Sequence, residues 1–292
     1  PPARAQLPPG GANLTKANPV RTHPRVVRGG GRARLWRGQW LTSFVLSDVV
    51  GDRLDVIASG PTAPDPTTFQ DAIEVLRRFA LWDESPAGVR TYLLAGQAGL
   101  RPETLKHLPS GVDHVLIGDN QAALAGARQK AGKLGYRVHD VSHLLGGEAA
   151  EAGRRLAAEA QAAMDRIGEG NQPICLLAGG ETTVPLGLRP GKGGRCQELV
   201  LAALAHSSSA GWGRMAFLCA GTDGEDGPTD AAGAYLDRGV VRRARELGLD
   251  VDKAIRRHDA YPFFDRSGGL FRPGRTGTNV MDLAVILLGP PS

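Results

Sequence analysis

Apolar runs of strand length alternate along the chain with stretches whose apolar residues recur at helical spacing. The segments with the length and composition of buried strands are 41–47, 114–118, 136–141, 174–179, 215–221 and 283–288. The segments with helical spacing between them are 67–81, 121–135, 148–168, 195–206 and 238–248. Strands that alternate with helices are typical of a parallel sheet covered on both faces. The pattern therefore predicts an α/β fold made of two three-layer units with mainly parallel sheets.

The chain starts with a segment of different character. Residues 1–39 are rich in Pro, Gly and Arg and show neither helical nor strand periodicity. We therefore expect residues 1–40 to be a disordered or degraded basic arm. The polar segment GEGNQP at 168–173 is the predicted boundary between the two α/β units. This boundary assigns 41–170 to the first unit and 171–292 to the second.

The net charge of +5 is unevenly distributed. Residues 1–40 contain eight Lys or Arg and no acid, whereas the remaining 252 residues hold 27 basic and 30 acidic side chains. A basic arm can bind nucleic acid or an anionic membrane. Because no other feature of the sequence indicates a nucleic-acid interface, a solvated terminus is the favoured interpretation. We expect neither nucleic acid nor a membrane as a partner.

Cysteine use and hydropathy indicate the compartment. No apolar run approaches the length of a membrane span, and no charged-then-apolar leader is present. The three cysteines, Cys175, Cys196 and Cys219, form no CxxC pair. An odd number of cysteines without a pairing pattern is typical of reduced thiols. The sequence therefore predicts a cytoplasmic protein.

Acidic and amide side chains follow four of the predicted strands, often with glycines beside them. These residues are Asp48, Asp52, Asp119, Asn120, Glu181, Asp223 and Asp226. In an open α/β sheet, ligands bind beyond the carboxyl ends of the strands. Any one of these segments alone is typical of a turn or a helix cap. Their convergence at one edge predicts a polar binding site.

The segment GGETTVPLGLRPGKGGRCQEL at 179–199 predicts an anion site. It is not a P-loop, because Gly187 is one residue too close to Lys192 and Gly193 follows the lysine. Glycines nevertheless leave backbone N–H groups open, and Lys192 and Arg195 add positive charge. The helix predicted to begin near Arg195 directs its positive end to the same place. The alternative is a basic loop that only caps this helix.

Phosphate and carboxylates at one edge are typical of a magnesium nucleotide site, because Mg²⁺ is held by one or two carboxylates together with phosphate oxygens. Asp223, with Asp226 or Asp48, could supply those carboxylates. A calcium loop is excluded, because Gly227 stands where a ligand is needed. No G-x-S-x-G elbow, CxxC zinc pattern or HExxH helix is present. His114 precedes an apolar strand and is interpreted as structural.

Five motifs follow one another along the chain: SDVVGDRLDVIASGPTAPDPTTF (47–69), GGETTV (179–184), GKGGRCQEL (191–199), GTDGEDGPTDAAGA (221–234) and TGTNVMDL (276–283). In this order they resemble the motifs of the type II glycerate 2-kinases. A weaker similarity extends to NPVRTHPRVVRGGGRA (18–33). The carboxyl-terminal half of this family is the MOFRL domain, which here corresponds to 171–292. Residues 41–170 then correspond to the remainder of the family's Rossmann-like N-terminal domain.

The resemblance implies ATP-dependent phosphorylation of D-glycerate at the 2-hydroxyl, with ATP and Mg²⁺ as cofactors, in a cleft between the two units. It also allows a homodimer. The implied catalytic residues are Arg195, Lys192 and Asp223, and the implied metal ligands are Asp223 and Asp226. The implied substrate-binding residues are Asp48, Asp52, Ser59, Gly60, Thr62, Gly180, Glu181, Gly193, Gly194, Gln197, Glu198, Thr222, Thr278 and Asn279. Among these, Thr278 and Asn279 are expected to close the site by hydrogen bonding.

The chain departs from the family pattern at several positions. Cys196 replaces the usual Asn, His258 and Ala260 alter an N-D-S-Y pattern, and Arg275 replaces a proline. Arg275 either strengthens anion binding in a salt-dependent way or is a surface charge without a role. The family's first glycine loop and a lysine expected to serve catalysis have no counterpart here. This leaves open an inactive chain or a ligand-binding remnant that is not catalytic.

A second enzymatic interpretation follows from the older family label of hydroxypyruvate reductase. A nicotinamide site is normally marked by G-x-G-x-x-G after a strand, followed by an acidic residue. None of the predicted strands is followed by that fingerprint. The sequence therefore favours the kinase over the reductase.

Overall fold

The computed structural model describes residues 14–167, 172–207 and 211–289. The chain divides into two compact units, 1–117 and 118–292. The division lies well before the predicted boundary at 168–173, of which residues 168–171 lie outside the described residues. The reason is packing, because residues on both sides of that segment contribute to one core. Ile167 and Ile174 are both members of it.

The first unit is mainly helical in its described part. Its elements are α1 (Leu14–Thr22), α2 (Gly31–Leu35), β1 (Leu41–Leu46), the 3-10 helix η2 (Ile57–Ser59), α3 (Phe69–Arg78), α4 (Ala87–Gln97) and β2 (Val112–Gly118). Helix α3 begins at a capping box, in which the Thr68 hydroxyl accepts from the N–H of Asp71 and the Asp71 carboxylate accepts from the N–H of Thr68. Its buried face, with Phe69, Ile73 and Leu76, forms a core with residues of α1 and α4.

The expectation of a disordered basic arm is wrong for α1 and α2, which cover Leu14–Thr22 and Gly31–Leu35, while residues 1–13 lie outside the described residues. Val20 is buried in the core of the first unit, and the ring of His23 lies 4.8 Å from the ring of Phe69. Periodicity missed α1 because this helix contains Pro19 and has no clear apolar face. Its contacts with α3 hold it in place, so tertiary packing stabilises it rather than local propensity.

The sheet of the compact unit 1–117 is small in its described part. Strands β1 and β2 form at the predicted positions, but they pair with each other in a sheet of two strands. Helix α3 packs against α1 and α4 instead of covering a sheet. Apolar side chains on both strands remain exposed, including Phe44 at 70% and Ile117 at 61%.

The second unit is built on a seven-stranded sheet with the order β3-β5-β9-β6-β7-β8, to which β4 adds by pairing with β5. The strands are β3 (Arg137–Asp140), β4 (Gly146–Glu148), β5 (Ile174–Thr183), β6 (Met215–Gly221), β7 (Gly233–Leu236), β8 (Leu270–Phe271) and β9 (Asp282–Leu288). The helices are α5 (Asn120–Lys133), α6 (Ala149–Asp165), α7 (Arg195–His206), α8 (Arg238–Glu246), α9 (Val251–Arg256) and α10 (Ala260–Ser267). The short 3-10 helices are η3 (Ser142–Leu144) and η4 (Gly211–Gly213).

This sheet is mixed rather than mainly parallel in its pairings. Strands β3 and β4 run parallel to β5, but β9 is antiparallel to both β5 and β6, and β7 is antiparallel to β6 and β8. Strands β5 and β6 therefore point the same way with β9 inserted between them. Because β9 runs in reverse, its first residue lies beside the last residues of its neighbours. Asp282 pairs with Gly180 on one side and with Gly221 on the other.

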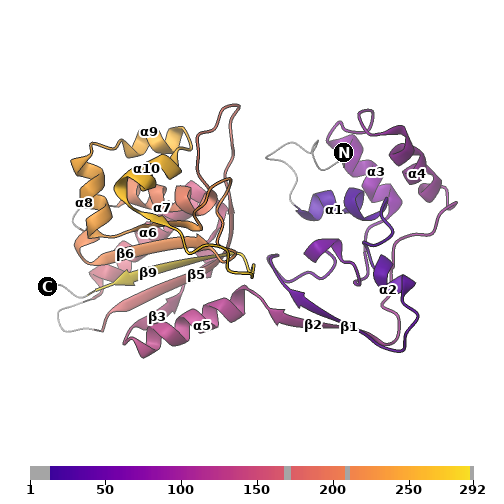
Figure 1. Cartoon of the computed structure of the whole chain (residues 1–292), viewed down its shortest axis with the longest axis horizontal. Helices are drawn as coiled ribbons and strands as arrows, with labels where there is room; N and C mark the ends of the chain where they lie inside the picture. Colours follow the sequence, from indigo (N-terminus) through magenta and orange to yellow (C-terminus); the bar gives the residue numbers. More distant parts are fainter. Residues whose placement is uncertain (1–13, 168–171, 208–210, 290–292) are drawn as a thin grey trace. The chain divides into compact units, whose positions relative to one another are not determined.

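Helices cover both faces of the sheet in the second unit, which confirms the predicted α/β class (Figure 1). Alternate residues of β5 divide between two cores, with Leu176 facing α6 and α7 and Cys175 facing α5.

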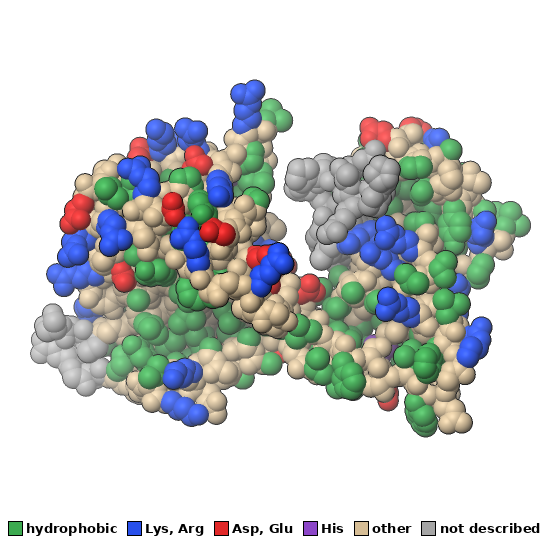
Figure 2. Space-filling model, in the orientation of Figure 1, with side chains coloured by type: hydrophobic (Ala, Val, Ile, Leu, Met, Phe, Trp, Pro, Cys, Tyr) green, Lys and Arg blue, Asp and Glu red, His purple; other side chains and the backbone are tan. Residues whose placement is uncertain are grey.

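Helix α8 is amphipathic, since Val240, Val241 and Ala244 are buried while its arginines are exposed. Figure 2 shows many Lys and Arg side chains over α8, α9 and α10. Among the described helices, none combines the length and the apolar content that crossing a membrane requires.

Helices α6 and α7 pack closely because Gly153 of α6 faces the backbone of α7. A Cβ atom added at Gly153 would lie 2.1 Å from the carbonyl oxygen of Leu199 and 3.2 Å from Cβ of Ala202. A backbone oxygen cannot rotate away as the end of a flexible side chain can. The glycine therefore sets the distance between the two helices.

Gly153→Ala should destabilise the protein by about 1–3 kcal/mol, because the added methyl group forces α6 and α7 apart. Gly126→Ala on α5 is the matched control, since a Cβ at Gly126 meets nothing within 4 Å. The control should stabilise the protein by about 0.5–1 kcal/mol through helix propensity. Denaturant unfolding followed by circular dichroism measures both changes. Equal stabilities of the two variants would contradict this account of the helix pair.

Candidate functional site

Four segments of the second unit meet at one edge of its sheet. They are the carboxyl end of β5, the carboxyl end of β6, the start of β9 and the first turn of α7. The register that places Asp282 between Gly180 and Gly221 brings the strand ends together. Asn120, the first residue of α5, donates to the carbonyl oxygens of Val280 and Asp282 and so fixes the chain before β9.

Arg195, predicted as a catalytic residue, is held by two carboxylates at this edge. Its Nε and Nη2 donate to the two oxygens of Asp282 at 2.6 Å and 2.9 Å, and its Nη1 donates to Glu181 at 2.7 Å. Asp282 is buried, with 2% of its side chain exposed, whereas the side chain of Glu181 is 39% exposed. Burial lowers the pKa of Arg195, but Asp282 and Glu181 outweigh it and raise the pKa above its ordinary value. The guanidinium therefore stays charged.

The positive end of α7 binds a carboxylate of the protein itself. Asp226, 3% exposed, accepts from the N–H groups of Cys196 and Gln197 at 3.1 Å and 2.9 Å. This is a capping arrangement in which an acid complements the helix dipole. Burial raises the pKa of Asp226 to about 6, the two N–H groups oppose the shift, and the charge of Asp282 adds to it. Within the protein, the carboxylate of Asp226 therefore occupies part of the helix end where an anion is predicted.

The predicted residues Gln197 and Glu198 are buried in the first turns of α7. The side-chain N–H of Gln197 donates to the hydroxyl of Thr229 at 3.0 Å. Glu198 pairs with Nδ1 of His258 at 2.8 Å. Burial raises the pKa of Glu198, and its bond with His258 offsets only part of that shift. Both side chains hold neighbouring loops against α7.

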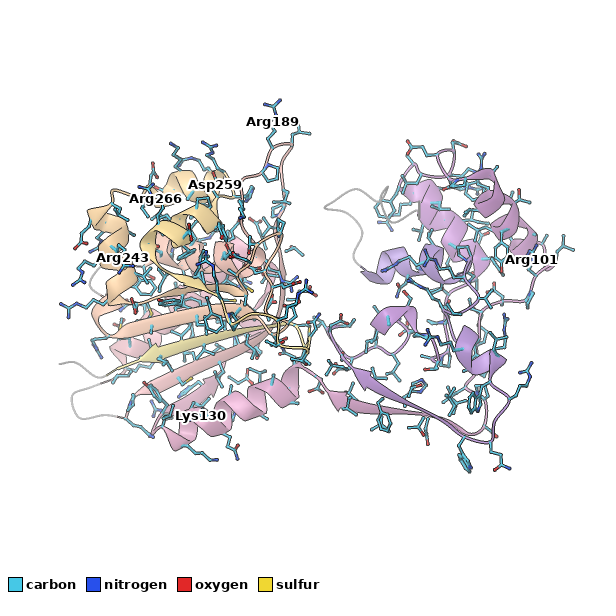
Figure 3. All side chains as sticks on the ribbon, in the orientation of Figure 1. Arg101, Lys130, Arg189, Arg243, Asp259 and Arg266 are labelled. Atoms are coloured by element: carbon cyan, nitrogen blue, oxygen red, sulfur yellow. The ribbon has the colours of Figure 1, made fainter. Side chains whose placement is uncertain are left out.

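The glycine loop before α7 is fastened to the turn between α9 and α10. The N–H of Gly191 donates to the carbonyl of Arg257 at 2.7 Å, and the N–H of Lys192 donates to Asp259 at 3.0 Å. Figure 3 labels Asp259 on this turn. The Lys192 ammonium lies 3.8 Å from the centroid of the Tyr261 ring, which is a cation–π contact. Gly193 and Gly194, both partly exposed, complete the loop.

The acidic loop after β6 and the loop before β9 are joined by hydrogen bonds centred on Thr222. Its hydroxyl donates to the carbonyl of Met281 at 2.7 Å and accepts from the N–H of Val280 at 2.8 Å, while its carbonyl accepts from the Thr276 hydroxyl at 2.6 Å. Asn279 accepts from the N–H of Met281 at 3.2 Å. The hydrogen bonds of Thr222 therefore join the two loops, and Asn279 fixes the backbone just before β9.

Three further predicted positions lie on these two loops. Asp223 accepts from the N–H of Glu225 at 2.9 Å through Oδ1. The N–H of Thr278, an exposed residue, donates to the hydroxyl of Thr276 at 3.3 Å. Arg275, 85% exposed, pairs with Glu225 at 2.7 Å. The partner of Arg275 in this structure is thus an acid of the neighbouring loop.

Five predicted substrate-binding residues lie in the first unit, and the structure gives two of them internal partners. The Ser59 hydroxyl donates to Asn18 at 3.1 Å and accepts from Arg28 at 3.0 Å. Thr62 bonds to Ser43 at 2.9 Å and to His114 at 3.0 Å. Ser59 and Gly60 have positive φ values of 63° and 54°, so this turn is strained at the serine.

The other two predicted positions of the first unit follow β1. Asp48 is exposed, and Asp52 is partly exposed with a φ of 53°. Within the described part of the chain, neither carboxylate makes a hydrogen bond or ion pair, so both are available to a ligand there.

The two predicted metal ligands differ in how well they suit Mg²⁺. Both oxygens of Asp226 accept backbone hydrogen bonds, which favours a capping role over metal binding. Among the described residues, Asp223 accepts through Oδ1 alone, so it fits as a single carboxylate ligand. Within the described ranges, no three Cys, His, Asp or Glu side chains form a group that could hold a metal ion. Metal binding by these residues stays a prediction.

Sequence reasoning missed Asp282, which contacts Arg195, and Tyr261, which contacts Lys192. A signal for Asp282 exists, because it is the one charged residue in the run VMDLAVILL at 280–288. A charge in a strand buried on both sides requires a partner. Tyr261 carries no comparable signal, because only the tertiary structure brings α10 to the glycine loop.

The comparisons with known proteins divide the chain into two matched regions. Residues 174–282 match the MOFRL family, and residues 3–94 match a domain of unknown function, DUF4147. The first match begins close to the predicted domain start at 171. It excludes α5 and α6, which the compact second unit contains.

Relatives and a solved structure match nearly the whole chain. The chain is 38% identical to a glycerate 2-kinase of Pyrococcus horikoshii, over 95% of this chain and 62% of that protein. It is 35% identical to a glycerate kinase of Macaca fascicularis, over 96% of this chain and 80% of that protein. The crystal structure of a glycerate kinase from Thermotoga maritima superposes with a TM-score of 0.80 at 38% identity, over 95% of this chain and 64% of that one. The chain thus spans less than two thirds of the archaeal relative's length.

Asp226→Asn should change the pH dependence of stability. In the folded protein the pKa of Asp226 is about 6, against 3.8 ordinarily. Between these values the folded chain keeps a proton that the unfolded chain releases, so the free energy of unfolding falls as the pH rises. Asparagine does not titrate. The free energy of unfolding of the variant should therefore rise by about 2–3 kcal/mol relative to that of the parent as the pH increases from about 4 to about 7. Denaturant unfolding over this pH range measures the free energy of unfolding of both proteins. Free energies that change in parallel with pH in the two proteins would contradict the prediction.

Proposed function

The chain belongs to the glycerate kinase family, and from this premise we propose that the protein transfers the γ-phosphoryl group of ATP to the 2-hydroxyl of D-glycerate. The observation that carries the proposal is Arg195, a permanently charged guanidinium held at the sheet edge where four segments meet. Two of the matched relatives bear the names glycerate 2-kinase and D-glycerate 2-kinase, which supports the 2-hydroxyl as the acceptor.

Phosphoryl transfer needs positioning and charge neutralisation more than covalent participation of the protein. Arg195 suits this role, because it offers directed N–H donors to phosphoryl oxygens and cannot lose its proton. Lys192 adds a second cation on the neighbouring glycine loop. Gly193 and Gly194 keep that loop free of side chains, so a phosphate can approach the backbone.

ATP and Mg²⁺ are the proposed cofactors. Asp223 would hold the metal through the oxygen that accepts no bond from Glu225, and the metal supplies charge neutralisation at the phosphoryl oxygens when bound. Asp48 and Asp52, whose carboxylates are available, are proposed to bind substrate in the first unit. Ser59, Gly60 and Thr62 would shape that region, since their bonds are made within the protein.

Reduction of hydroxypyruvate is not proposed. The matched relatives bear the names of kinases, and none of the described strands is followed by the dinucleotide-binding fingerprint.

The test is to incubate the protein with D-glycerate, ATP and Mg²⁺ and to identify the product by phosphorus NMR. Product phosphorylated at the 2-position supports the proposal. Product phosphorylated only at the 3-position, or no product, refutes it.

Arg195→Ala should lower kcat by roughly 10²–10³-fold with a much smaller change in KM, because its charge acts mainly on the transition state. Arg242→Ala is the matched control, since Arg242 lies on α8, is 72% exposed and pairs with Glu246 at 3.6 Å. The control should retain parental kinetics. Steady-state assays measure both variants, and similar losses in the two would remove Arg195 from the chemistry.

A further inference from the structure

Two carboxylates share the guanidinium of Arg195, and they come from different environments. Asp282 is almost fully buried and binds bidentately through Nε and Nη2. Glu181 is 39% exposed at the end of β5 and accepts a hydrogen bond from Nη1 of Arg195 at 2.7 Å. The contact with Asp282 is buried on the acid's side, and the contact with Glu181 is partly exposed.

Asp282 has the properties of a group that orients another. It lies at the start of a central strand and pairs on both sides with glycines, so its backbone position is fixed. A bidentate contact fixes the plane of the guanidinium as well as its position. Asp282 is buried while the side chain of Arg195 is 35% exposed, so the arginine can be held from within the protein and still reach a ligand.

Glu181 has the properties of a group that can be replaced. Its ion pair with Arg195 is partly exposed, and such pairs are weak in water. A guanidinium has five N–H donors, of which Asp282 and Glu181 take three. A phosphoryl oxygen carries the same charge as a carboxylate oxygen and accepts the same N–H bond.

We propose that Asp282 is a positioning residue that fixes the guanidinium of Arg195, and that Glu181 occupies its outer edge until a phosphoryl oxygen of the substrate replaces it. The identity of this oxyanion rests on the proposed function. The contact with Glu181 thus keeps the arginine in its working orientation before substrate binds and competes with substrate for it.

The experiment measures binding of inorganic tripolyphosphate to the chain by isothermal titration calorimetry, without turnover. Glu181→Gln should bind three- to tenfold more tightly than the parent, because the competing charge is gone. Asp282→Asn should bind at least tenfold more weakly, because the guanidinium loses its orientation. Glu151→Gln on α6 is the control, since Glu151 is 49% exposed and pairs with Arg154 at 2.6 Å. It should leave the affinity unchanged.

A merely structural role of Asp282 is distinguished by repeating the substitutions in an Arg195→Ala background. There, Asp282→Asn and Glu181→Gln should cause no further change in affinity, because both act through the arginine. Further weakening by Asp282→Asn in that background would overturn its positioning role. If Asp282→Asn fails to fold, the test rests on Glu181→Gln. A tripolyphosphate affinity of Glu181→Gln equal to that of the parent overturns the inference.

The two proposals fail in different ways. Absence of 2-phosphoglycerate with intact tripolyphosphate binding and the expected Glu181 effect counts against the proposed function and supports this inference. Turnover of D-glycerate with no effect of Glu181→Gln on affinity supports the proposed function and overturns this inference.

Discussion

The ion pair between Arg195 and Asp282 is the interaction on which the arrangement of the sheet edge depends. Asp282 is buried at the start of β9, and a buried carboxylate without a partner would be strongly destabilising. The strand can begin there only if α7 presents Arg195 to it. The pair therefore fixes the first turn of α7 relative to the ends of β5 and β6. The contact of Glu181 with Arg195 is built on that placement.

The charge balance around α7 follows from the same placement. Asp226 meets the positive end of the helix, while Asp282 and Glu181 meet the guanidinium. The positive groups at this edge are thus already balanced by acids of the protein, and Lys192 lies over Tyr261. A phosphorylated ligand must compete with these internal partners. Competition of this kind favours ligands that carry several negative charges over single carboxylates.

The reversed direction of β9 gives the site its fourth segment. In an all-parallel sheet, only carboxyl ends of strands would meet at this edge. Because β9 is antiparallel to both neighbours, its start and the loop before it come to the same edge. That loop joins the acidic loop after β6 through Thr222. The mixed topology therefore explains why two motifs far apart in the sequence share one network of hydrogen bonds.

The sequence by itself determined the α/β class, the glycine loop before α7, the acidic loop after β6 and the family, because periodicity and motifs are local signals. It did not reveal the burial of α1, the division after Ile117, the direction of β9 or the partners of Arg195. The contact between Arg195 and Asp282 joins residues 87 positions apart. Such a contact depends on strand order and register, which no local pattern contains, and so only the tertiary structure decided it.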